Sequence, residues 1–420
     1  QLIAEGCLVA DRQGTRVAQF VAQPIAPSSN RDMPTAPLRL SNRAAAAMQP
    51  EPAREAAARP FAPGTPDYGA FPFRSWRACL ERAWRDAGWR QLGYAGHGGD
   101  SALREALAGH LTTARGLSVD AGQIVITSGT QAALDLCARL LCDHGDTVWA
   151  ENPGYLAARV AFSLAGLRVH DVPVDGEGLA PSEDDWNRHP PRLIMITPSH
   201  QYPTGRVMPL PRRLALIERA RQSSAWIIED DYDSEFRRTG PAPPALFGLL
   251  PDSPVVYVGT FSKTLYPGLR LGYLVLPHAI AADFARATTQ AMRFGQGIEQ
   301  RALADFIQRG HYTTHLRRMR ARYGARQVAL RAALKDAFGP SVELSGGEAG
   351  LHLVMWLPES IGDTEVAKCA AEMGLGVRAL GSYTRAPMTC NGLVLGYGNL
   401  AEGMLAEAVR RLAVAVRSPA

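Results

Sequence analysis

The chain has 420 residues and a formal net charge of +5, with 46% hydrophobic and 20% charged residues. This length leaves room for two or three domains with ample cores, and the composition is that of an ordinary globular protein. The mild positive charge is compatible with DNA contact but is too small to indicate a nucleic-acid-binding protein by itself.

Cysteine usage and hydropathy point to one compartment. The six cysteines are scattered and form no Cys-x-x-Cys pair, which is typical of reduced residues in a cytoplasmic protein. No apolar run is long enough to span a bilayer, and no signal segment begins the chain. We therefore predict a cytoplasmic protein without a membrane partner, and we predict no metal site.

The first 22 residues have a pattern of their own. It predicts a helix that ends at Gly6, followed by two short strands, Cys7–Val9 and Arg16–Val21, around a Gln13-Gly14 turn. A plain N-terminal hairpin is one interpretation of this pattern. Residues 23–60 are rich in Pro, Ala, Ser and Arg, which predicts a mostly irregular linker in which Ala44–Ala58 could be transiently helical.

The globular body begins near Phe71. An amphipathic pattern predicts a helix over Trp76–Trp84, and a second helix is expected over Ala102–Arg115. Between them lies the glycine-rich turn Gly93–Asp100, which contains Tyr94.

A strand, a small polar turn and a helix follow one another after residue 120. The strand is Ile124–Thr127 and the helix is Ala132–Cys142, and the turn between them consists of Ser128, Gly129, Thr130 and Gln131. Free backbone N–H groups and the helix dipole favour an anion at such a helix N-terminus. Turns of this kind are common, so the motif needs support from its context.

Further strands alternate with helices up to about residue 280. Thr147–Ala150 ends in a turn that contains Tyr155, and Leu193–Thr197 ends in a turn that contains Tyr202. This alternation predicts a mostly parallel sheet, with its ligand at the carboxyl ends of the strands.

Trp226–Arg237 combines a buried strand with a cluster of carboxylates at its end. An unpaired carboxylate there is costly and requires a cationic partner. Asp230 and Asp231 are the candidates for this pairing. Metal binding and a solvated acidic turn are the alternatives.

Lys263 lies between two apolar strand patterns, Val255–Thr260 and Leu271–Tyr273. The chain has 45 Lys plus Arg but only three lysines, and arginine cannot form a Schiff base. A desolvated lysine has a lowered pKa and attacks carbonyls as a free amine. The alternative is an ordinary lysine retained by chance. Nearby phosphate-binding candidates are Thr260, Ser262 and Arg270.

The C-terminal part predicts a smaller α/β domain. A long arginine-rich helix over His311–Ala337 is expected to present a solvated face and to join the domains. Strands are expected at Leu351–Leu357, Gly376–Leu380 and Leu393–Tyr397, and a final helix at Glu402–Val416.

These motifs carry a family resemblance from about Phe71 to the C-terminus. Gly259–Tyr273 resembles the cofactor-lysine segment of fold-type I pyridoxal-phosphate (PLP) aminotransferases, and more narrowly that of MocR regulators, a branch of the GntR transcription factors. The resemblance implies an α/β, aspartate aminotransferase-like fold. It has a large, mostly parallel-sheet domain and a smaller C-terminal α/β domain.

The resemblance also implies roles for individual residues. Lys263 would form the internal aldimine with PLP and serve as the proton-transfer base. Asp230, with Asp231 as fallback, would face the pyridinium nitrogen, and Tyr232 would bond the phenolic oxygen. Tyr155 would lie against the ring, and Tyr94 would reach the phosphate of the partner subunit in a homodimer.

Two departures from the aminotransferase pattern weaken the case for transamination. Tyr202 stands where aminotransferases carry an asparagine that bonds the phenolic oxygen. The arginine that usually holds the substrate carboxylate is absent near Val394. Arg378 and Arg385 are the candidates to replace it, with plain surface residues as the alternative. Arg159 could also meet a substrate carboxylate, or cap a surface.

We therefore divide the chain into four parts: a remnant of a winged-helix wing (1–22), a linker (23–60), a large PLP-binding domain with an N-terminal arm (61–315) and a small domain (316–420). The favoured function is the effector domain of a MocR/GntR-type regulator that senses PLP, a small amine or an amino acid. DNA would be bound through a recognition helix upstream of residue 1. The alternative is an active PLP-dependent aminotransferase that acts on an amino acid.

Overall fold

The structure is a computed structural model. It describes Ile3 and residues 8–17, 39–48, 58–89, 93, 96–238, 240, 243–292, 295–385, 390–400 and 402–417. The chain divides into two compact units, Gln1–Asn42 and Arg43–Ala420, and the second is called the main unit below.

The first unit contains a β-hairpin. Strand β1 (Leu8–Asp11) pairs antiparallel with β2 (Gly14–Val17), so the two predicted short strands are confirmed in this part. The predicted helix end at Gly6 and the extension of the second strand to Val21 lie outside the described residues. The assignment of residues 1–22 to a wing stays a prediction.

The predicted linker contains a helix among its described residues. Helix α1 (Asn42–Ala47) includes four consecutive alanines, the residue with the highest helix propensity. It overlaps the start of Ala44–Ala58, the part of the linker in which the sequence allows a transient helix. Most of residues 23–60 lie outside the described part.

Within the main unit, eight described strands form one mixed sheet. Neighbouring strands from β9 to β5 are parallel, whereas β10 runs antiparallel to β3 and β9, and β6 runs antiparallel to β5. The prediction of a large, mostly parallel sheet is therefore confirmed. The strands are, in spatial order, β3 (Ile124–Thr127), β10 (Gly272–Val275), β9 (Val255–Thr260), β8 (Trp226–Asp231), β7 (Leu193–Ile196), β4 (Thr147–Asn152), β5 (Arg168–Asp175) and β6 (Gly178–Leu179).

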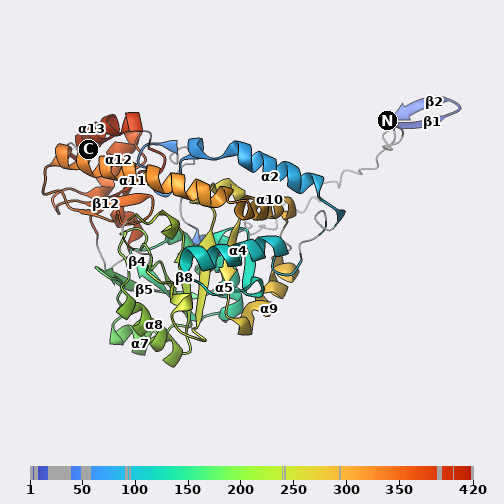
Figure 1. Cartoon of the computed structure of the whole chain (residues 1–420), viewed down its shortest axis with the longest axis horizontal. Coiled ribbons are helices and arrows are strands. Elements are labelled where there is room, and N and C mark those ends of the chain that lie inside the picture. The colour runs from blue at the N-terminus through green and yellow to red at the C-terminus, as the bar shows by residue number, and fades with distance from the viewer. Residues whose placement is uncertain are drawn as a thin grey trace, which may run out of the picture. The chain divides into compact units, whose positions relative to one another are not determined.

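Burial explains why these segments are strands. Every residue of β3, β7 and β9 is buried, and these segments are rich in Val and Ile, whose branched side chains pack well on a pleated sheet. Such strands require cover on both faces. Figure 1 shows the helices packed around the sheet. They are α4 (Ser101–Arg115), α5 (Thr130–Leu141), α6 (Leu156–Leu164), α7 (Glu183–Arg188), α8 (Leu210–Gln222), α9 (His278–Ala287) and α10 (Gly297–Gln308).

A smaller four-stranded sheet follows, in the order β11 (Leu344–Ser345), β12 (His352–Trp356), β14 (Gly392–Gly396) and β13 (Arg378–Ala379). It packs with α12 (Asp363–Glu372) and α13 (Leu405–Arg417) at one end of the main unit, away from α7 and α8 (Figure 1). The predicted small α/β domain is thus present. The predicted boundary between residues 315 and 316 falls inside one helix, α11 (His311–Phe338).

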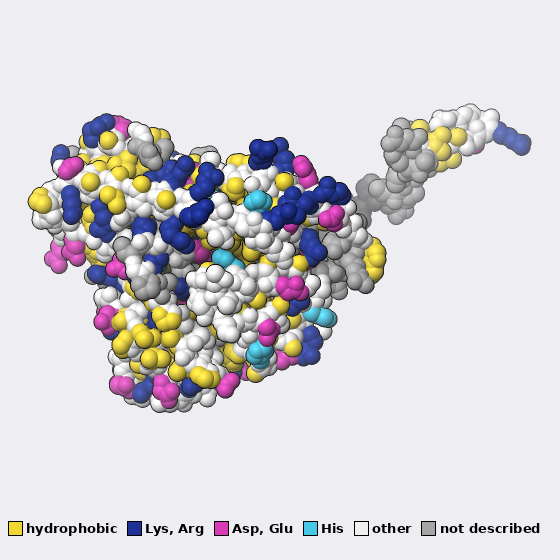
Figure 2. Space-filling view, in the orientation of Figure 1, with side chains coloured by type: hydrophobic (Ala, Val, Ile, Leu, Met, Phe, Trp, Pro, Cys, Tyr) yellow, Lys and Arg dark blue, Asp and Glu magenta, His cyan; other side chains and the backbone are white. Residues whose placement is uncertain are grey.

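Helix α11 joins the two sheets. Its buried residues, among them Leu316 and Leu330, belong to a core cluster that also contains Trp76 of α2 (Phe73–Arg85) and Leu395 of β14. Its exposed side carries arginines, and Figure 2 shows Lys and Arg side chains along α11 and α2. The predicted arginine-rich solvated face is therefore present. None of the helices in the described ranges has both the length and the apolar composition needed to cross a bilayer.

An extended arm, residues 58–66, lies against the small sheet. Gly396 of β14 donates its backbone N–H to the Phe61 carbonyl at 2.9 Å, and Gly376 donates to the Pro60 carbonyl at 2.7 Å. A Cβ at Gly396 would overlap the backbone of Ala62, so this close approach requires glycine. The arm then continues to Gly64, beside Lys263.

We expect Gly396→Ala to displace the arm and lower the free energy of unfolding by about 1–3 kcal/mol, as overpacked sites do. Urea denaturation measures this loss. Gly403→Ala is the matched control, because nothing lies within 4 Å of a Cβ there. Equal stability of the Gly396→Ala and Gly403→Ala proteins would contradict this account of the arm.

Candidate functional site

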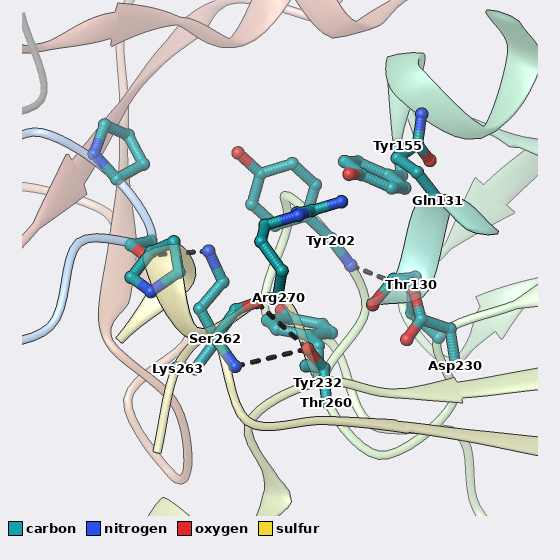
Figure 3. A pocket seen from close by; sticks show the side chains of 14 residues that line it. Thr130, Gln131, Tyr155, Tyr202, Asp230, Tyr232, Thr260, Ser262, Lys263 and Arg270 are labelled. Atoms are coloured by element: carbon teal, nitrogen blue, oxygen red, sulfur yellow. Dashed lines mark hydrogen bonds between the residues drawn. The ribbon is translucent and has the colours of Figure 1, made fainter. Parts of the chain in front are cut away.

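A cavity of about 210 Å³ opens at the carboxyl ends of the parallel strands. Most of the residues predicted for the site line it (Figure 3): Thr130, Gln131, Tyr155, Tyr202, Asp230, Tyr232, Thr260, Ser262, Lys263 and Arg270. Four other lining residues are not predicted from the sequence: Pro63, Gly64, Thr197 and Pro267. Tyr94 lies outside the described residues.

Lys263 follows β9, and its amine points into the cavity (Figure 3). The amine donates a hydrogen bond to the Gly64 carbonyl of the arm at 2.8 Å. Burial lowers the pKa of this amine, although the charges of Asp233 and Asp230 act in the opposite direction. A lowered pKa increases the fraction of free amine that can attack a carbonyl.

Asp230 is the second-last residue of β8 and lies on the opposite side of the cavity from Lys263 (Figure 3). Its carboxylate is buried, and its Oδ1 atom has no hydrogen-bond partner among the described residues. Burial, followed by the charges of Asp231, Glu151 and Asp233, raises the pKa of Asp230 to about 8. A cation placed against Asp230 would relieve this cost.

Asp231 points elsewhere, into a buried ion cluster. Its Oδ2 atom accepts hydrogen bonds from Tyr257 at 2.7 Å and Ser234 at 2.8 Å, and it pairs with Arg115 at 2.8 Å. Asp231 therefore has its cationic partner inside the protein. Between the two carboxylates considered from the sequence, the geometry favours Asp230 as the residue that faces a ligand.

The other end of the cavity suits an anion. Helix α5 begins there after Gly129, whose φ of 92° is unfavourable for other residues. The guanidinium of Arg270 lies 3.4–3.5 Å from the position that a Gly129 Cβ would occupy. The Thr260 and Ser262 hydroxyls lie 3.1 Å apart beside it. Ser128 and Gly129 position this helix N-terminus but do not themselves line the cavity.

Three tyrosines, Tyr155, Tyr202 and Tyr232, line the cavity together. Tyr155 and Tyr232 each meet the ring of Tyr202 edge-on, at centroid distances of 6.1 and 5.9 Å. The Tyr202 hydroxyl lies 3.0 Å from that of Tyr383, in the short helix η8 (Leu380–Tyr383) of the small domain. The residue that replaces the usual asparagine is thus linked to the small domain.

The three arginines considered for a carboxylate lie in different surroundings. Arg159 pairs with Asp171 of β5 and does not line the cavity. The Arg385 guanidinium donates to the Thr384 carbonyl at 2.9 Å. Arg378 lies on β13 directly opposite Val394 in the antiparallel register, and its side chain hydrogen bonds with Tyr383.

His200, Asp233 and His352 form a buried group that the sequence did not indicate. Their ligand atoms lie within 4.8 Å of one another, as in a metal site. Hydrogen bonds within the protein already use several of these atoms: His200 Nδ1 lies 3.1 Å from Asp233, and His352 Nε2 lies 3.0 Å from the Pro203 carbonyl. The absence of a metal site stays a prediction.

The residues fit a flat, cationic ring that carries a phosphate. Among the described residues, one Asp230 oxygen lacks a hydrogen-bond partner, and Gly129 leaves room for the Arg270 guanidinium. The Lys263 amine, whose pKa is lowered, lies across the cavity from Asp230. Aromatic side chains line the cavity, and one of them, Tyr155, is the N-cap residue of α6. Fold and site together define a PLP-dependent protein of the aminotransferase type.

Comparisons with known proteins agree. The family model of aminotransferase class I and II matches residues 61–390. The chain is 35% identical over 412 residues to a probable rhizopine catabolism regulatory protein, MocR, of Rhizobium meliloti, covering 98% of this chain and 83% of that protein. It is 33% identical to the pyridoxine biosynthesis regulator PdxR of Corynebacterium glutamicum, covering 85% and 76%.

Among solved structures, LysN, the α-aminoadipate aminotransferase of Thermus thermophilus, matches with a TM-score of 0.80 and 29% identity, over 89% of this chain and 96% of that one. It was solved with a phosphopyridoxyl-leucine compound. The chain therefore belongs to the aminotransferase class I and II family, in the branch of MocR-type transcriptional regulators. Its cofactor is pyridoxal 5'-phosphate.

The pKa of Asp230 leads to a test on protein stripped of cofactor. Folding raises the pKa of Asp230 to about 8. The protonated carboxyl therefore contributes its full stabilisation below the usual carboxyl pKa, and this contribution is lost as pH rises through about 8. We expect Asp230→Asn to become more stable than wild type between pH 5 and 9, by on the order of a few kcal/mol. Urea unfolding measures the gap. Asp135→Asn, on the surface, is the control, and a gap that does not widen with pH would refute this account.

Proposed function

We propose that this chain is the PLP-binding effector domain of a MocR/GntR-type transcriptional regulator, with Lys263 as the residue that holds the cofactor covalently. The observation that carries this proposal is one cavity with the Lys263 amine and the Asp230 carboxylate on opposite sides. Within the described part of the chain, Oδ1 of Asp230 has no hydrogen-bond partner. PLP supplies an aldehyde that condenses with amines and a ring that withdraws electrons.

The chain's residues would divide the binding. Asp230 would pair with the ring nitrogen, and Tyr155 would cover the ring. Arg270 and the N-terminus of α5 would hold the phosphate, helped by the Thr260 and Ser262 hydroxyls. Lys263 would accept and return protons at its nitrogen if chemistry proceeds.

We propose that the effector is a small amine or amino acid with a carboxylate, and that Arg378 binds this carboxylate. Residues directly opposite in an antiparallel pair project to the same face of the sheet, so Arg378 and Val394 share a face. Val394 packs there with Tyr202 and Tyr383. Arg378 on β13 would thus take the role that aminotransferases give to an arginine on β14.

A catalytically active aminotransferase is the second candidate. The family match and the likeness to LysN favour it. Purified protein loaded with PLP and offered amino acids and amines one at a time separates the two functions. Release of keto acid supports the enzyme, whereas a cofactor spectrum that changes without keto acid supports the sensor.

The proposed assembly is a cytoplasmic homodimer in which Tyr94 completes the phosphate site of the partner subunit. DNA would be bound by a winged-helix domain to which residues 1–22 belong. The regulatory relatives support DNA binding by the whole protein.

The assignment of Lys263 predicts that Lys263→Ala binds PLP without covalent attachment. Borohydride reduction followed by intact-mass measurement should show one added cofactor on wild type and none on this variant. Lys335→Ala and Lys368→Ala are matched controls on exposed helix positions and should keep the adduct. A reducible adduct on the Lys263→Ala protein would defeat the assignment.

The assignment of Arg378 predicts that Arg378→Gln weakens binding of carboxylate-bearing amines at least about tenfold, the value of a charged hydrogen bond. Amines without a carboxylate should bind with little change. Titration of the cofactor absorbance gives both affinities. Arg159→Gln is the control, because Arg159 pairs with Asp171 away from the cavity. Equal losses in the two variants would exclude this role for Arg378.

A further inference from the structure

A buried hydrogen-bonded chain leads from Asp233 to the cavity. Asp233 is 1% exposed and lies three residues after Asp230. Its carboxylate oxygens lie 3.1 and 3.2 Å from His200 Nδ1, and the Tyr232 hydroxyl lies 3.0 Å from the same nitrogen. The Tyr232 hydroxyl also donates to the His200 carbonyl at 2.9 Å, and Tyr232 lines the cavity. None of the functions assigned above uses Asp233 or His200.

The small domain closes over this chain. A Cβ at Gly350 would overlap both Asp233 and the His200 ring, so the backbone before β12 lies directly on the pair. His352 of β12 lies 4.8 Å from His200, ring to ring. Water is therefore excluded from the pair, and a charge on Asp233 is screened little.

Several titratable groups surround this carboxylate. Burial, followed by the charge of His200, lowers the pKa of His352, so this imidazole stays neutral. The groups that Asp233 influences are Asp230, Tyr232, Glu235, Lys263 and Tyr397, in addition to its partner His200. Besides burial, the charge of Arg378 lowers the pKa of Lys263, whereas the charges of Asp233 and Asp230 raise it. Once Asp230 is neutralised by a cationic ring nitrogen, Asp233 is the remaining carboxylate among those acting on Lys263.

We propose that Asp233 is a positioning residue that, through His200, fixes the Tyr232 hydroxyl and keeps a proton on the nitrogen of Lys263 when this lysine holds the cofactor. This inference rests on the proposed function, because it takes Lys263 as the cofactor lysine. Tyr202 stands in place of the asparagine that bonds the phenolic oxygen, and its hydroxyl contacts Tyr383 instead. The phenolic oxygen would therefore depend on the Tyr232 hydroxyl, which His200 holds in place.

The test is a pH titration of the cofactor absorbance in the PLP-loaded chain, which reports protonation of the Lys263 nitrogen. Asp233→Asn should lower the midpoint by about one unit or more, because it removes a nearby opposite charge. His200→Ala should shift it in the same direction, because a buried carboxylate without its N–H donor takes up a proton itself. The matched control is Asp185→Asn, which breaks a similar pair, His170–Asp185 at 2.7 Å, outside the site.

A folded, PLP-loaded Asp233→Asn protein with an unchanged or raised midpoint would overturn the proposal. If Asp233→Asn does not fold, an unchanged or raised midpoint in the His200→Ala protein would overturn the proposal instead. Cofactor content and the borohydride adduct are measured on each protein first. Loss of the adduct from wild type would reject the assignment of Lys263, whereas an intact adduct with an unmoved midpoint rejects only the role of Asp233.

Discussion

The site depends on how the protein balances charge around one amine. Lys263 lies where burial favours its neutral form, while the two carboxylates Asp230 and Asp233 favour its protonated form. Asp230 in turn has a raised pKa because it is buried and lies near other carboxylates, Asp231 first among them. A cofactor with a basic ring nitrogen satisfies Asp230 and leaves the amine free to react, so binding relieves a cost that the folded chain otherwise carries.

A second group of charges, around Asp231, supports this arrangement. Asp231 is satisfied by Arg115, at the end of α4, and by two hydroxyl groups. Arg115 itself donates to Ser199 at 3.2 Å, in the turn that carries His200. Adjacent residues of one strand point to opposite faces. Asp231 can therefore anchor the sheet to α4 while Asp230 faces the ligand.

Local patterns in the sequence predict much of this. Apolar runs with polar ends at Thr127, Asp231 and Thr260 locate three strands and the edge at which their ligand residues meet. The contribution of the arm could not be predicted, because Gly64 meets Lys263 across 199 residues and carries only a carbonyl. The same holds for Arg378, since only the register of β13 against β14 places it opposite Val394. The alanine run indicates a possible helix over Ala44–Ala58, and helix α1 overlaps the start of this range.

The replacement of asparagine by Tyr202 ties these features to regulation. An asparagine would act only within the large domain, whereas the Tyr202 hydroxyl reaches Tyr383, next to Arg378. An amine joined to the cofactor in place of Lys263, and held through its carboxylate by Arg378, would bridge the large and small sheets. A ligand changes a conformational equilibrium only through contacts that differ between states. Contacts split between two sheets provide such a difference.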